Sequence, residues 1–500
     1  MRRLYDVAEI RAAEHALMAT LPDGALMQRA AAGLARTCAA LLPAVYGARA
    51  VVLAGGGDNG GDALYAAARL ADRGARVDAL QVTSKVHPGG ADAARRAGVR
   101  LHRAGSGDDE RLLAAADLVV DGIVGIGAQG PLRPDAARLV ELTDDAAGLV
   151  VAVDVPSGVD AATGRVDGAA VHADVTVTFG AAKPGLVVSP GAQHTGALEV
   201  VDIGLGPHLP AATAAELDAD DVAALLPQPY GETSKYGRGV VGLVAGSDVY
   251  TGAAVLATGG AIAAGAGMVR FVGVRHPAEL VRAHWPEAVV TVIEPGAADR
   301  LLAAGRVQAW VVGSGLGTDP AAAALVEAVL GTDVPVLVDA DGITLLADRI
   351  DLLRRRTAPT LLTPHAGEFA RLTGTHRAEV ESDRLAHARR AAGDLGATVL
   401  LKGTTTVVAA ADGQVRVNPT GTPWLATAGS GDVLAGACGA LLAGGLAALE
   451  AGAVGAFLHG LAARLAAGPA GAQAPIRAAD VIGRWPAAVR TVCGGADGSS

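Results

Sequence analysis

The chain has 500 residues, of which 51% are hydrophobic, 18% are charged and 3% are aromatic. This composition excludes an intrinsically disordered protein, which would be poor in apolar residues and rich in charge, and the length predicts two or three domains. The formal net charge of −10 argues against a nucleic-acid-binding protein, because such proteins normally carry a basic patch.

The first half of the sequence predicts alternating strands and helices. Short runs of Val, Leu and Ile between glycine-rich turns are typical of parallel strands that are buried on both faces. The predicted strands are residues 49–54, 77–82, 118–121, 149–155, 175–179 and 198–203. From about residue 204 to residue 228 this pattern stops, and prolines and acidic residues predict a linker with one short helix.

A second sheet is predicted after the linker. Its candidate strands are residues 240–245, 269–274, 289–293, 309–313, 336–339, 360–363, 398–402, 406–409 and 414–417. The two halves share no motif, so we expect two different α/β domains, residues 1–212 and residues 213–500. In open sheets of this class, ligands bind beyond the carboxyl ends of the strands, which is where the glycine-rich loops fall.

The sequence also predicts the cellular compartment. Its three cysteines lie far apart, which suits a cytoplasmic protein without disulfide bonds. The first 18 residues contain acidic side chains and no apolar stretch, so no signal peptide is expected. Residues 249–268 have no charged side chain, but they are mostly Ala and Gly without aromatic or basic flanks. They predict a close-packed buried helix and no membrane partner.

The first glycine-rich loop, GGGDNGGD at residues 55–62, lies between a strand and a helix. Glycines let the backbone approach a ligand closely, and the start of a helix attracts an anion. The loop is not a P-loop, because no Lys-Ser or Lys-Thr pair follows it. An ordinary turn in which Asp62 caps the helix is the alternative interpretation.

Two further strand ends carry oxygen ligands. Residues 121–131 (DGIVGIGAQGP) and 154–160 (DVPSGVD) each place an acidic residue before a glycine-containing loop. Asn59, Asp121 and Ser157 could converge there, and oxygen ligands without Cys or His suit a hard cation. Their low total charge favours a large monovalent ion over magnesium. For each Asp alone, capping is the commoner role.

These three motifs resemble the NAD(P)H-hydrate epimerase domain, over roughly residues 1–210. The resemblance implies a bound potassium ion at Asn59, Asp121 and Ser157, and it makes Asp154 the acid/base candidate. It also implies binding of a hydrated nicotinamide nucleotide by the two glycine-rich loops and by that aspartate. The implied substrate-binding residues are Asp58, Asn59, Gly60, Gly61, Asp62, Gly125, Ile126, Gly127, Ala128, Gln129, Gly130, Pro131 and Asp154.

In the second half, the strongest motif is GSGD at residues 429–432, ahead of an apolar helix. Its glycines leave backbone N–H groups available to hold a phosphoryl group. Asp432 can take a proton from an attacking hydroxyl. KGTTT at residues 402–406 is a candidate nucleotide cradle, and His365 follows another strand. The alternative roles are an ordinary acidic residue at a helix start for Asp432 and capping or packing for His365.

The motifs SKYGRG, GSGLG, LTPHAGEF, LKGTTT and NPTGTPWLATAGSGDVLAG resemble the ribokinase-like superfamily, over roughly residues 215–490. Within it they are similar to the ADP- or ATP-dependent NAD(P)H-hydrate dehydratase. The resemblance implies a magnesium ion beside the phosphates. It implies substrate contacts at Ala266, Gly315, His365 and Asp432, and nucleotide contacts at Lys402, Gly403, Thr404, Thr405, Thr406 and Gly431.

The two resemblances together imply an α/β protein with an N-terminal Rossmann-like parallel-sheet domain and a C-terminal ribokinase-like domain. Its expected function is repair of hydrated NADH and NADPH (NADHX and NADPHX). One domain epimerises the R and S hydrates, and the other dehydrates the S form with ADP or ATP, giving NAD(P)H, AMP and phosphate. We expect a homo-oligomer that binds small molecules only. A vitamin or sugar kinase with an appended nucleotide-binding domain and a non-catalytic nucleotide-sensing scaffold are the alternatives.

Overall fold

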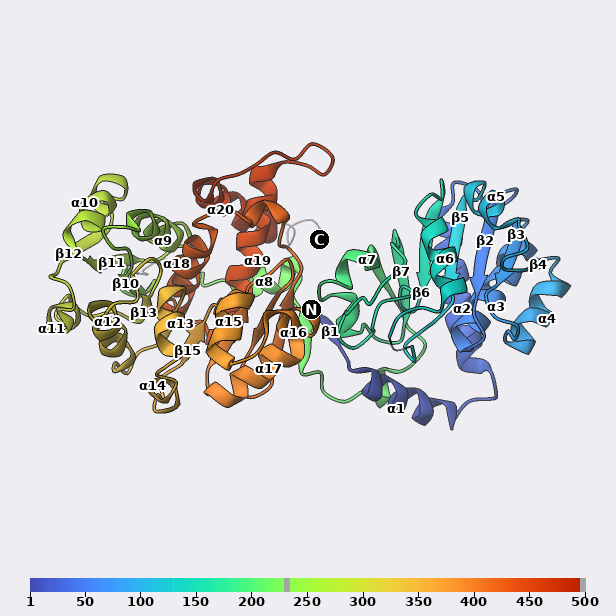
Figure 1. The fold of residues 1–500 in the computed structure, drawn as a ribbon, viewed down its shortest axis with the longest axis horizontal. Coiled ribbons are helices and arrows are strands. Elements are labelled where there is room, and N and C mark those ends of the chain that lie inside the picture. The colour runs from blue at the N-terminus through green and yellow to red at the C-terminus, as the bar shows by residue number, and fades with distance from the viewer. Residues whose placement is uncertain (129, 229–233, 495–500) are drawn as a thin grey trace. The chain divides into compact units, whose positions relative to one another are not determined.

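The computed structural model describes residues 1–128, 130–228 and 234–494 (Figure 1). The chain divides into two compact units, one from Arg3 to Thr213 and one from Ala214 onward that also includes Met1–Arg2. The predicted substrate residue Gln129 lies outside the described residues.

The first unit is built on a seven-stranded sheet in the order β4-β3-β2-β5-β6-β7-β8, with all neighbouring strands parallel. The chain moves outward from β2 to β3 and β4, and then returns to the other side of β2 with β5. The order of the strands therefore reverses between β2 and β5, which is the point where open sheets bind ligands. The strands are β2 (Arg49–Ala54), β3 (Arg76–Gln81), β4 (Arg100–Arg103), β5 (Leu118–Gly122), β6 (Leu149–Val153), β7 (Val175–Phe179) and β8 (Ala197–Val201).

Helices cover both faces of this sheet, because alternate residues of a strand point to opposite sides. In β2, Val52 joins the core formed with α1, α2 and α3, whereas Val51 and Leu53 join the core formed with α5 and α6. The helical segments are α1 (Val7–Met18), α2 (Ala25–Leu41), α3 (Asp58–Asp72), α4 (Pro88–Arg96), α5 (Asp109–Ala114), α6 (Pro134–Thr143), η1 (Pro184–Leu186), α7 (Ala192–Thr195) and η2 (Gly206–His208).

The second unit has a mixed sheet with the order β1-β9-β18-β17-β16-β15-β14-β13-β10-β11-β12 over the described residues. The strands from β10 to β16 pair in parallel, and β17 is antiparallel to both of its neighbours. The strands are β1 (Arg2–Leu4), β9 (Ala214–Glu216), β10 (Val240–Val244), β11 (Met268–Gly273), β12 (Val289–Val292), β13 (Ala309–Val312), β14 (Val336–Val338), β15 (Thr360–Leu362), β16 (Thr398–Leu401), β17 (Thr406–Ala409) and β18 (Val415–Asn418).

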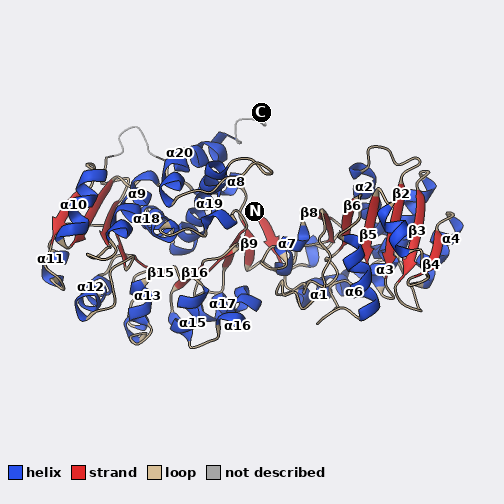
Figure 2. Ribbon diagram, turned by 45° about the horizontal axis from the view of Figure 1, so that its top comes forward, coloured by secondary structure: helices blue, strands red, loops and turns tan. Residues whose placement is uncertain are grey.

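Two layers of helices enclose the second sheet. Figure 2 shows α9, α18, α19 and α20 on one face and α12, α13, α15 and α17 on the other. The helical segments are α8 (Ala219–Leu225), α9 (Thr251–Ala263), α10 (Arg275–His284), α11 (Ala298–Leu302), α12 (Pro320–Leu330), α13 (Asp341–Leu346), α14 (Asp351–Arg354), α15 (Ala366–Thr373), α16 (Arg377–Ser382), α17 (Arg384–Leu395), η3 (Pro423–Leu425), α18 (Ser430–Ala443), α19 (Ala448–Ala467) and α20 (Ala478–Gly494).

The Ala- and Gly-rich segment at residues 249–268 forms α9 and then reaches the first residue of β11. Its helix packs against α18 at very short range, because a Cβ atom at Gly260 would collide with the carbonyl of Val433. A Cβ at Gly436 would likewise collide with the carbonyl of Ala257. The predicted close-packed buried helix is therefore confirmed over α9. Within the described ranges, no helix combines the length and the apolar character that crossing a membrane requires.

The predicted strands are present, with ends that shift by one or two residues. The interpretation of residues 204–228 as a linker with one helix is only partly right: α8 is the helix, but β9 also lies there and pairs with β18. The short edge strands β1 and β4 were not predicted. The sequence of β4 is RLHR, which lacks the apolar run of a buried strand.

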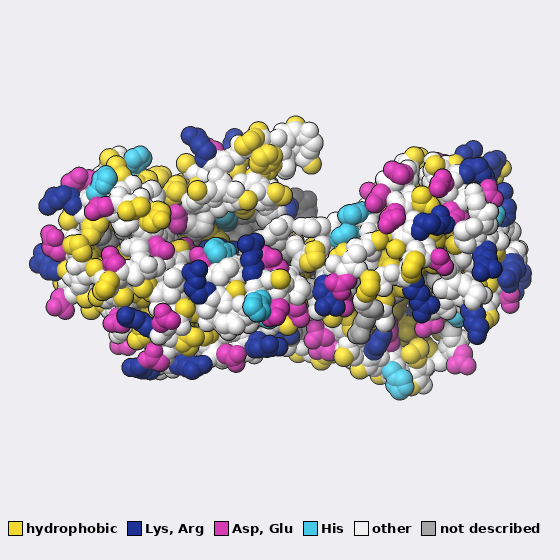
Figure 3. Space-filling model, viewed as in Figure 1, with side chains coloured by type: hydrophobic (Ala, Val, Ile, Leu, Met, Phe, Trp, Pro, Cys, Tyr) yellow, Lys and Arg dark blue, Asp and Glu magenta, His cyan; other side chains and the backbone are white. Residues whose placement is uncertain are grey.

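Figure 3 shows charged side chains of both signs on one face of the protein. On the face shown in Figure 3, Lys and Arg alternate with Asp and Glu and do not gather into one basic patch. This distribution agrees with the acidic composition of the chain.

Candidate active sites

A cavity of about 1230 Å³ opens in the first unit where the carboxyl ends of β2 and β5 meet. The loops after β2, β3, β4 and β5 contribute to its wall, and Asp154 follows β6. The cavity thus lies at the point where the strand order reverses. The predicted substrate residues that line it are Asp58, Asn59, Asp62, Gly125, Ile126, Gly127, Ala128, Gly130, Pro131 and Asp154, while Gly60 and Gly61 lie in the first turn of α3 beside it.

The glycines of the first loop are required by close packing. A Cβ atom at Gly55 would collide with the carbonyl oxygen of Ile123, and one at Gly60 would collide with the carbonyl oxygen of Gly55. Helix α3 begins at Asp58 with Gly57 as its N-cap residue, so Asp62 does not cap it. The capping interpretation of Asp62 is therefore wrong. Its side chain is buried in the cavity wall instead.

Asp154 has a strained backbone and a buried cation beside it. Its φ angle is +65°, a left-handed conformation that residues other than Gly seldom adopt and that is often found at functional sites. Its Oδ1 accepts hydrogen bonds from Lys183 Nζ, from Thr178 Oγ1 (3.1 Å) and from the N–H of Phe179 (3.2 Å). These donors fix the carboxylate at the edge of the cavity.

Sequence reasoning missed Lys183, although it is one of only four lysines in the chain. Its side chain is 1% exposed, and Nζ also donates to Thr178 Oγ1 at 2.7 Å. Glu14 of α1 was missed as well; it lines the cavity, and burial followed by the charge of Asp154 raises its pKa. No motif surrounds these two residues, so only their position in the fold reveals them.

The cavity wall also contains unpaired positive charge. Arg103 at the end of β4 and Arg133 before α6 both line it, and neither forms an ion pair with another described residue. Arg138 lines it too, paired with Asp109. Guanidinium groups of this kind match the charge and geometry of phosphate oxygens.

The three predicted cation ligands do converge. Asp121 Oδ1 accepts from Ser157 Oγ at 2.7 Å, and Ser157 Oγ accepts from the N–H of Val124 at 3.1 Å. The side chain of Asn59 donates to the carbonyl of Val124 at 2.8 Å. Burial raises the pKa of Asp121 to about 6, against the opposing effect of its hydrogen bonds from Ser157 and Ile123. A fully buried carboxylate with hydroxyl, amide and carbonyl oxygens beside it fits a monovalent cation.

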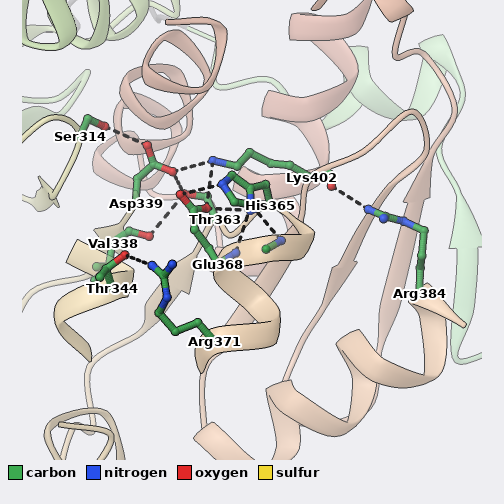
Figure 4. A network of polar contacts seen from close by, with 11 residues as sticks. Ser314, Val338, Asp339, Thr344, Thr363, His365, Glu368, Arg371, Arg384 and Lys402 are labelled. Carbon is green, nitrogen blue, oxygen red and sulfur yellow. Dashed lines mark hydrogen bonds and ion pairs between the residues drawn. The ribbon is translucent and has the colours of Figure 1, made fainter. Parts of the chain in front are cut away.

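In the second unit, Asp339 is the centre of a buried polar network at the end of β14 (Figure 4). Its Oδ2 accepts from Ser314 Oγ at 2.9 Å. Its Oδ1 accepts from Thr363 Oγ1 at 2.8 Å and from Lys402 Nζ at 2.9 Å. Asp339 was not predicted as a site residue, because a single Asp after a strand carries no distinctive motif. It is the residue that joins the ends of β13, β14, β15 and β16.

Asp432 lies in the first turn of α18, which starts after Gly429 in a left-handed conformation (φ +86°). Burial raises the pKa of Asp432 to about 7; the charge of Asp339 adds to this rise, and Lys402 opposes it. A Cβ atom added at Gly431 would lie 3.4 Å from Lys402 Nζ, so the lysine lies directly beside the GSGD loop. The network therefore brings an acid with a raised pKa, a cation and a helix start together.

The remaining predicted residues differ in their surroundings. Gly315 adopts φ +62° and packs against Tyr250. His365 caps α15: its Nδ1 accepts from the N–H groups of Gly367 (3.0 Å) and Glu368 (3.1 Å). Capping, the alternative role of His365, is thus observed, although its ring remains 61% exposed.

Ala266 and the KGTTT loop complete the predicted set. Ala266 lies between α9 and β11, and no hydrogen bond among the described residues connects it to the Asp339 network. Residues 402–405 connect β16 to β17, which begins at Thr406, and Lys402 of this loop enters the network. Arg384 was not predicted; it holds the loop by donating to the carbonyl of Lys402 at 2.7 Å.

Comparison with known proteins now decides the family. Residues 241–484 match the family model described as NAD(P)H-hydrate dehydratase, and residues 23–185 match that of the YjeF-related protein N-terminus. The chain is 52% identical over 455 residues to the bifunctional NAD(P)H-hydrate repair enzyme Nnr of Mycobacterium tuberculosis (strain ATCC 25618 / H37Rv), covering 90% of this chain and 91% of that protein. The chain belongs to the bifunctional NAD(P)H-hydrate repair enzymes.

Two further proteins resemble the chain at lower sequence identity. The enzyme of Thermofilum pendens is 37% identical, over 84% of this chain and 83% of its own. The ADP/ATP-dependent NAD(P)H-hydrate dehydratase of Bacillus subtilis, co-crystallised with ATP and Mg²⁺, superimposes with a TM-score of 0.51 and 31% identity over 55% of this chain and 98% of its own. The predicted α/β fold class and the predicted membership of a repair-enzyme family are therefore confirmed.

Proposed function

We propose that the first unit, within residues 1–212, interconverts the R and S hydrates of NADH and NADPH. The second unit, within residues 213–500, dehydrates the S hydrate and consumes ADP or ATP; with ADP the products are NAD(P)H, AMP and phosphate. The observation that carries this proposal is that each sheet has its own acidic site at the carboxyl ends of its strands, around Asp154 in one and Asp432 in the other. A kinase with an appended binding domain would need no second acid/base site.

In the second unit, Asp432 acts as the general base. It takes the proton of the hydrate's hydroxyl, and the oxygen attacks the terminal phosphorus of the nucleotide as the bond to the nucleotide leaving group breaks. The N–H groups at the start of α18 and the ammonium of Lys402 stabilise the charge that develops on phosphate. Phosphate then leaves C6 as C5 loses a proton, and the ring double bond reforms. Phosphate leaves far more easily than hydroxide, so phosphorylation lowers the barrier to dehydration.

The remaining contacts to the hydrate and to the nucleotide in the second unit are proposed from the positions of these residues in the sequence motifs. Ala266, Gly315 and His365 hold the hydrate, while Lys402, Gly403, Thr404, Thr405, Thr406 and Gly431 hold the nucleotide. The charges of Asp339 and Asp341 raise the pKa of Asp432, whereas the charge of Lys402 and a hydrogen bond from Ser314 lower it. Three carboxylates and one ammonium leave the site with excess negative charge, which fits a cation. These carboxylates would hold a magnesium ion, which neutralises the charge on transferring phosphates.

In the first unit, Asp154 exchanges protons with the hydrate, and the glycine loops hold the nucleotide. Its phosphates would lie against Arg103 and Arg133, and its hydrated ring against the acidic side chains of the cavity. Potassium is proposed at Asn59, Asp121 and Ser157, where it would compensate the buried carboxylate and fix the loops. We further propose that the protein works in the cytoplasm as a homo-oligomer.

One incubation tests the two proposed activities. The purified chain is mixed with separated R and S hydrates, with and without ADP or ATP, and the absorbance of reduced nicotinamide is followed while chromatography resolves the epimers. Epimer interconversion without nucleotide, and recovery of NAD(P)H with release of inorganic phosphate when nucleotide is present, are expected. A stable phosphoester product would indicate a small-molecule kinase, and the absence of any turnover would indicate a scaffold.

A further inference from the structure

The first unit contains a buried carboxyl group that the proposed chemistry leaves without a role. Asp62 of α3 is 9% exposed and lines the same cavity as Asp154. Its Oδ1 is buried and has no hydrogen-bond partner among the described residues. A buried carboxylate oxygen without a partner is costly, whereas a protonated carboxyl, or one that meets a substrate hydroxyl, avoids that cost.

Asp62 and Asp154 have opposite surroundings. Asp154 accepts hydrogen bonds from the ammonium of Lys183, from Thr178 Oγ1 and from the N–H of Phe179. Asp62 forms no ion pair with a basic side chain among the described residues, and burial, then Asp154 and Asp58, raise its pKa well above the ordinary value. Two carboxyl groups of one site that lie in such different environments are a common arrangement of an acid and a base.

We propose that Asp62 is a second catalytic residue of the epimerase, the proton donor that works together with Asp154 as the base. The inference rests on the proposed epimerase function. It assigns to Asp62 a chemical role beyond substrate binding, and it makes the cavity a two-carboxyl site.

The chemistry follows from the position of the hydroxyl. C6 of the hydrate carries a hydroxyl group and is bonded to the ring nitrogen. Asp62 gives its proton to the hydroxyl oxygen, the C6–O bond breaks, and the lone pair of the nitrogen forms a C=N bond, so water is released. The water then adds to the opposite face of C6 as the C=N electrons return to nitrogen, and Asp154 accepts the proton that the water loses. Proton exchange with solvent restores the starting state.

This role predicts a specific pH dependence. Asp62 donates only when protonated, so epimerisation should fall as pH rises through its raised pKa. Glu14 of α1 is the competing candidate, because its pKa is also raised and it lines the same cavity. Other titratable or charged groups on the elements around Asp62 include Arg11, Asp58, Tyr65, His87, Asp154 and Lys183.

The test compares Asp62→Asn with Asp72→Asn, an exposed carboxylate at the other end of the same helix. Epimerisation of the purified S hydrate is measured in potassium buffer across a range of pH, by chromatography, on the full chain. We expect Asp62→Asn to lower kcat by about 10²–10⁴, the usual loss for a general acid, and to remove the alkaline decline. KM and the nucleotide-dependent dehydration should change little, because Asn replaces a neutral carboxyl of the same shape. The melting temperature at neutral pH should not fall, because the variant no longer holds a proton that the unfolded chain releases. Asp72→Asn should match the wild type.

Several results would overturn the proposal. A wild-type kcat for Asp62→Asn, or a higher KM with an unchanged kcat, would reduce Asp62 to a binding residue. If the alkaline decline persists in Asp62→Asn and disappears in Glu14→Gln, Glu14 is the donor. If Asp62→Asn does not fold, the wild-type profile decides, because a rate that does not fall at high pH excludes a carboxyl donor. A wild-type protein that does not epimerise at all would instead refute the proposed function itself.

Discussion

Replacement of Asp432 by Asn should change two properties of the second unit in different directions: the rate of dehydration and the stability of the fold. The carboxyl group lies in the first turn of α18, close to Asp339 and Lys402. As the proposed general base it must be ionised, yet burial and the charge of Asp339 oppose ionisation and raise its pKa to about 7. The variant keeps the shape of the side chain and can neither ionise nor accept the proton.

The expected loss of rate is that of a general base, about 10²–10⁴ in the dehydration step. In the wild type, that step should become faster as pH rises through about 7, where Asp432 ionises. Epimerisation by the first unit should continue at the wild-type rate.

The same substitution, which lowers the rate, should raise the stability of the folded protein above neutral pH. The folded pKa of about 7 lies above the ordinary value of 3.8, so the folded state holds a proton that the unfolded state has released between these pH values. Stability from this group is therefore complete below pH 3.8 and is lost as pH rises to 7. The loss is on the order of 4 kcal/mol at most, since one pKa unit corresponds to about 1.4 kcal/mol. Asp432→Asn escapes this loss, and at pH 8 it should be more stable than the wild type.

The assay combines nucleotide-dependent recovery of NAD(P)H with denaturant unfolding at pH 5 and pH 8. Asp394→Asn, which changes an exposed carboxylate on α17, is the matched control and should affect neither measurement. A folded Asp432→Asn that dehydrates at the wild-type rate would refute the role of base. A variant that is less stable than the wild type at pH 8 would refute the electrostatic reasoning.

Four further predictions concern other parts of the chain. Lys183→Met leaves Asp154 buried without its cation, so it should abolish epimerisation and lower the unfolding free energy of the first unit by roughly 3–5 kcal/mol, measured in urea. Asp121→Ala should lower epimerisation and blunt its response in a potassium titration, while dehydration stays unchanged. A fragment of residues 213–500 should fold and dehydrate the S hydrate, although it lacks β1 at the sheet edge, as circular dichroism and the activity assay would show. Gly260→Val should destabilise the second unit by at least 1–3 kcal/mol in thermal unfolding, because its side chain collides with the backbone of α18.

Each of these four predictions would be contradicted by a specific result. A fully active Lys183→Met would show that the lysine only packs. Equal epimerase activity with and without potassium, in buffers checked for the ion, would remove the cation from the proposal. An insoluble 213–500 fragment would mean that the second unit does not fold by itself, and an unchanged melting temperature for Gly260→Val would mean that α9 and α18 can separate at little cost.

The sequence by itself determined the α/β class, nearly all of the buried strands and the glycine-rich loops that follow them. These features are local: a buried parallel strand needs a continuous apolar run, and a close backbone approach needs Gly at that position, as at Gly55 and Gly60. The motifs also indicated the family, because in these segments backbone geometry and ligand chemistry allow few amino acids at each position. Asn59, Asp121 and Ser157 could be grouped for a similar reason, since each lies at the end of a predicted parallel strand or in the loop that follows it.

Apart from the three cation ligands, only the tertiary structure decided which side chains meet. Lys183 contacts Asp154, which is 29 residues away in the sequence, and Lys402 contacts Asp339, which is 63 residues away. Strand β9, at the start of the second unit, pairs with β18 near the end of the same unit. The burial that raises the pKa of Asp62 and Asp432 likewise comes from several elements at once. Periodicity and motifs report the conformation and burial of a single segment, whereas these contacts depend on strand order and helix packing, which arise only when the whole sheet is assembled.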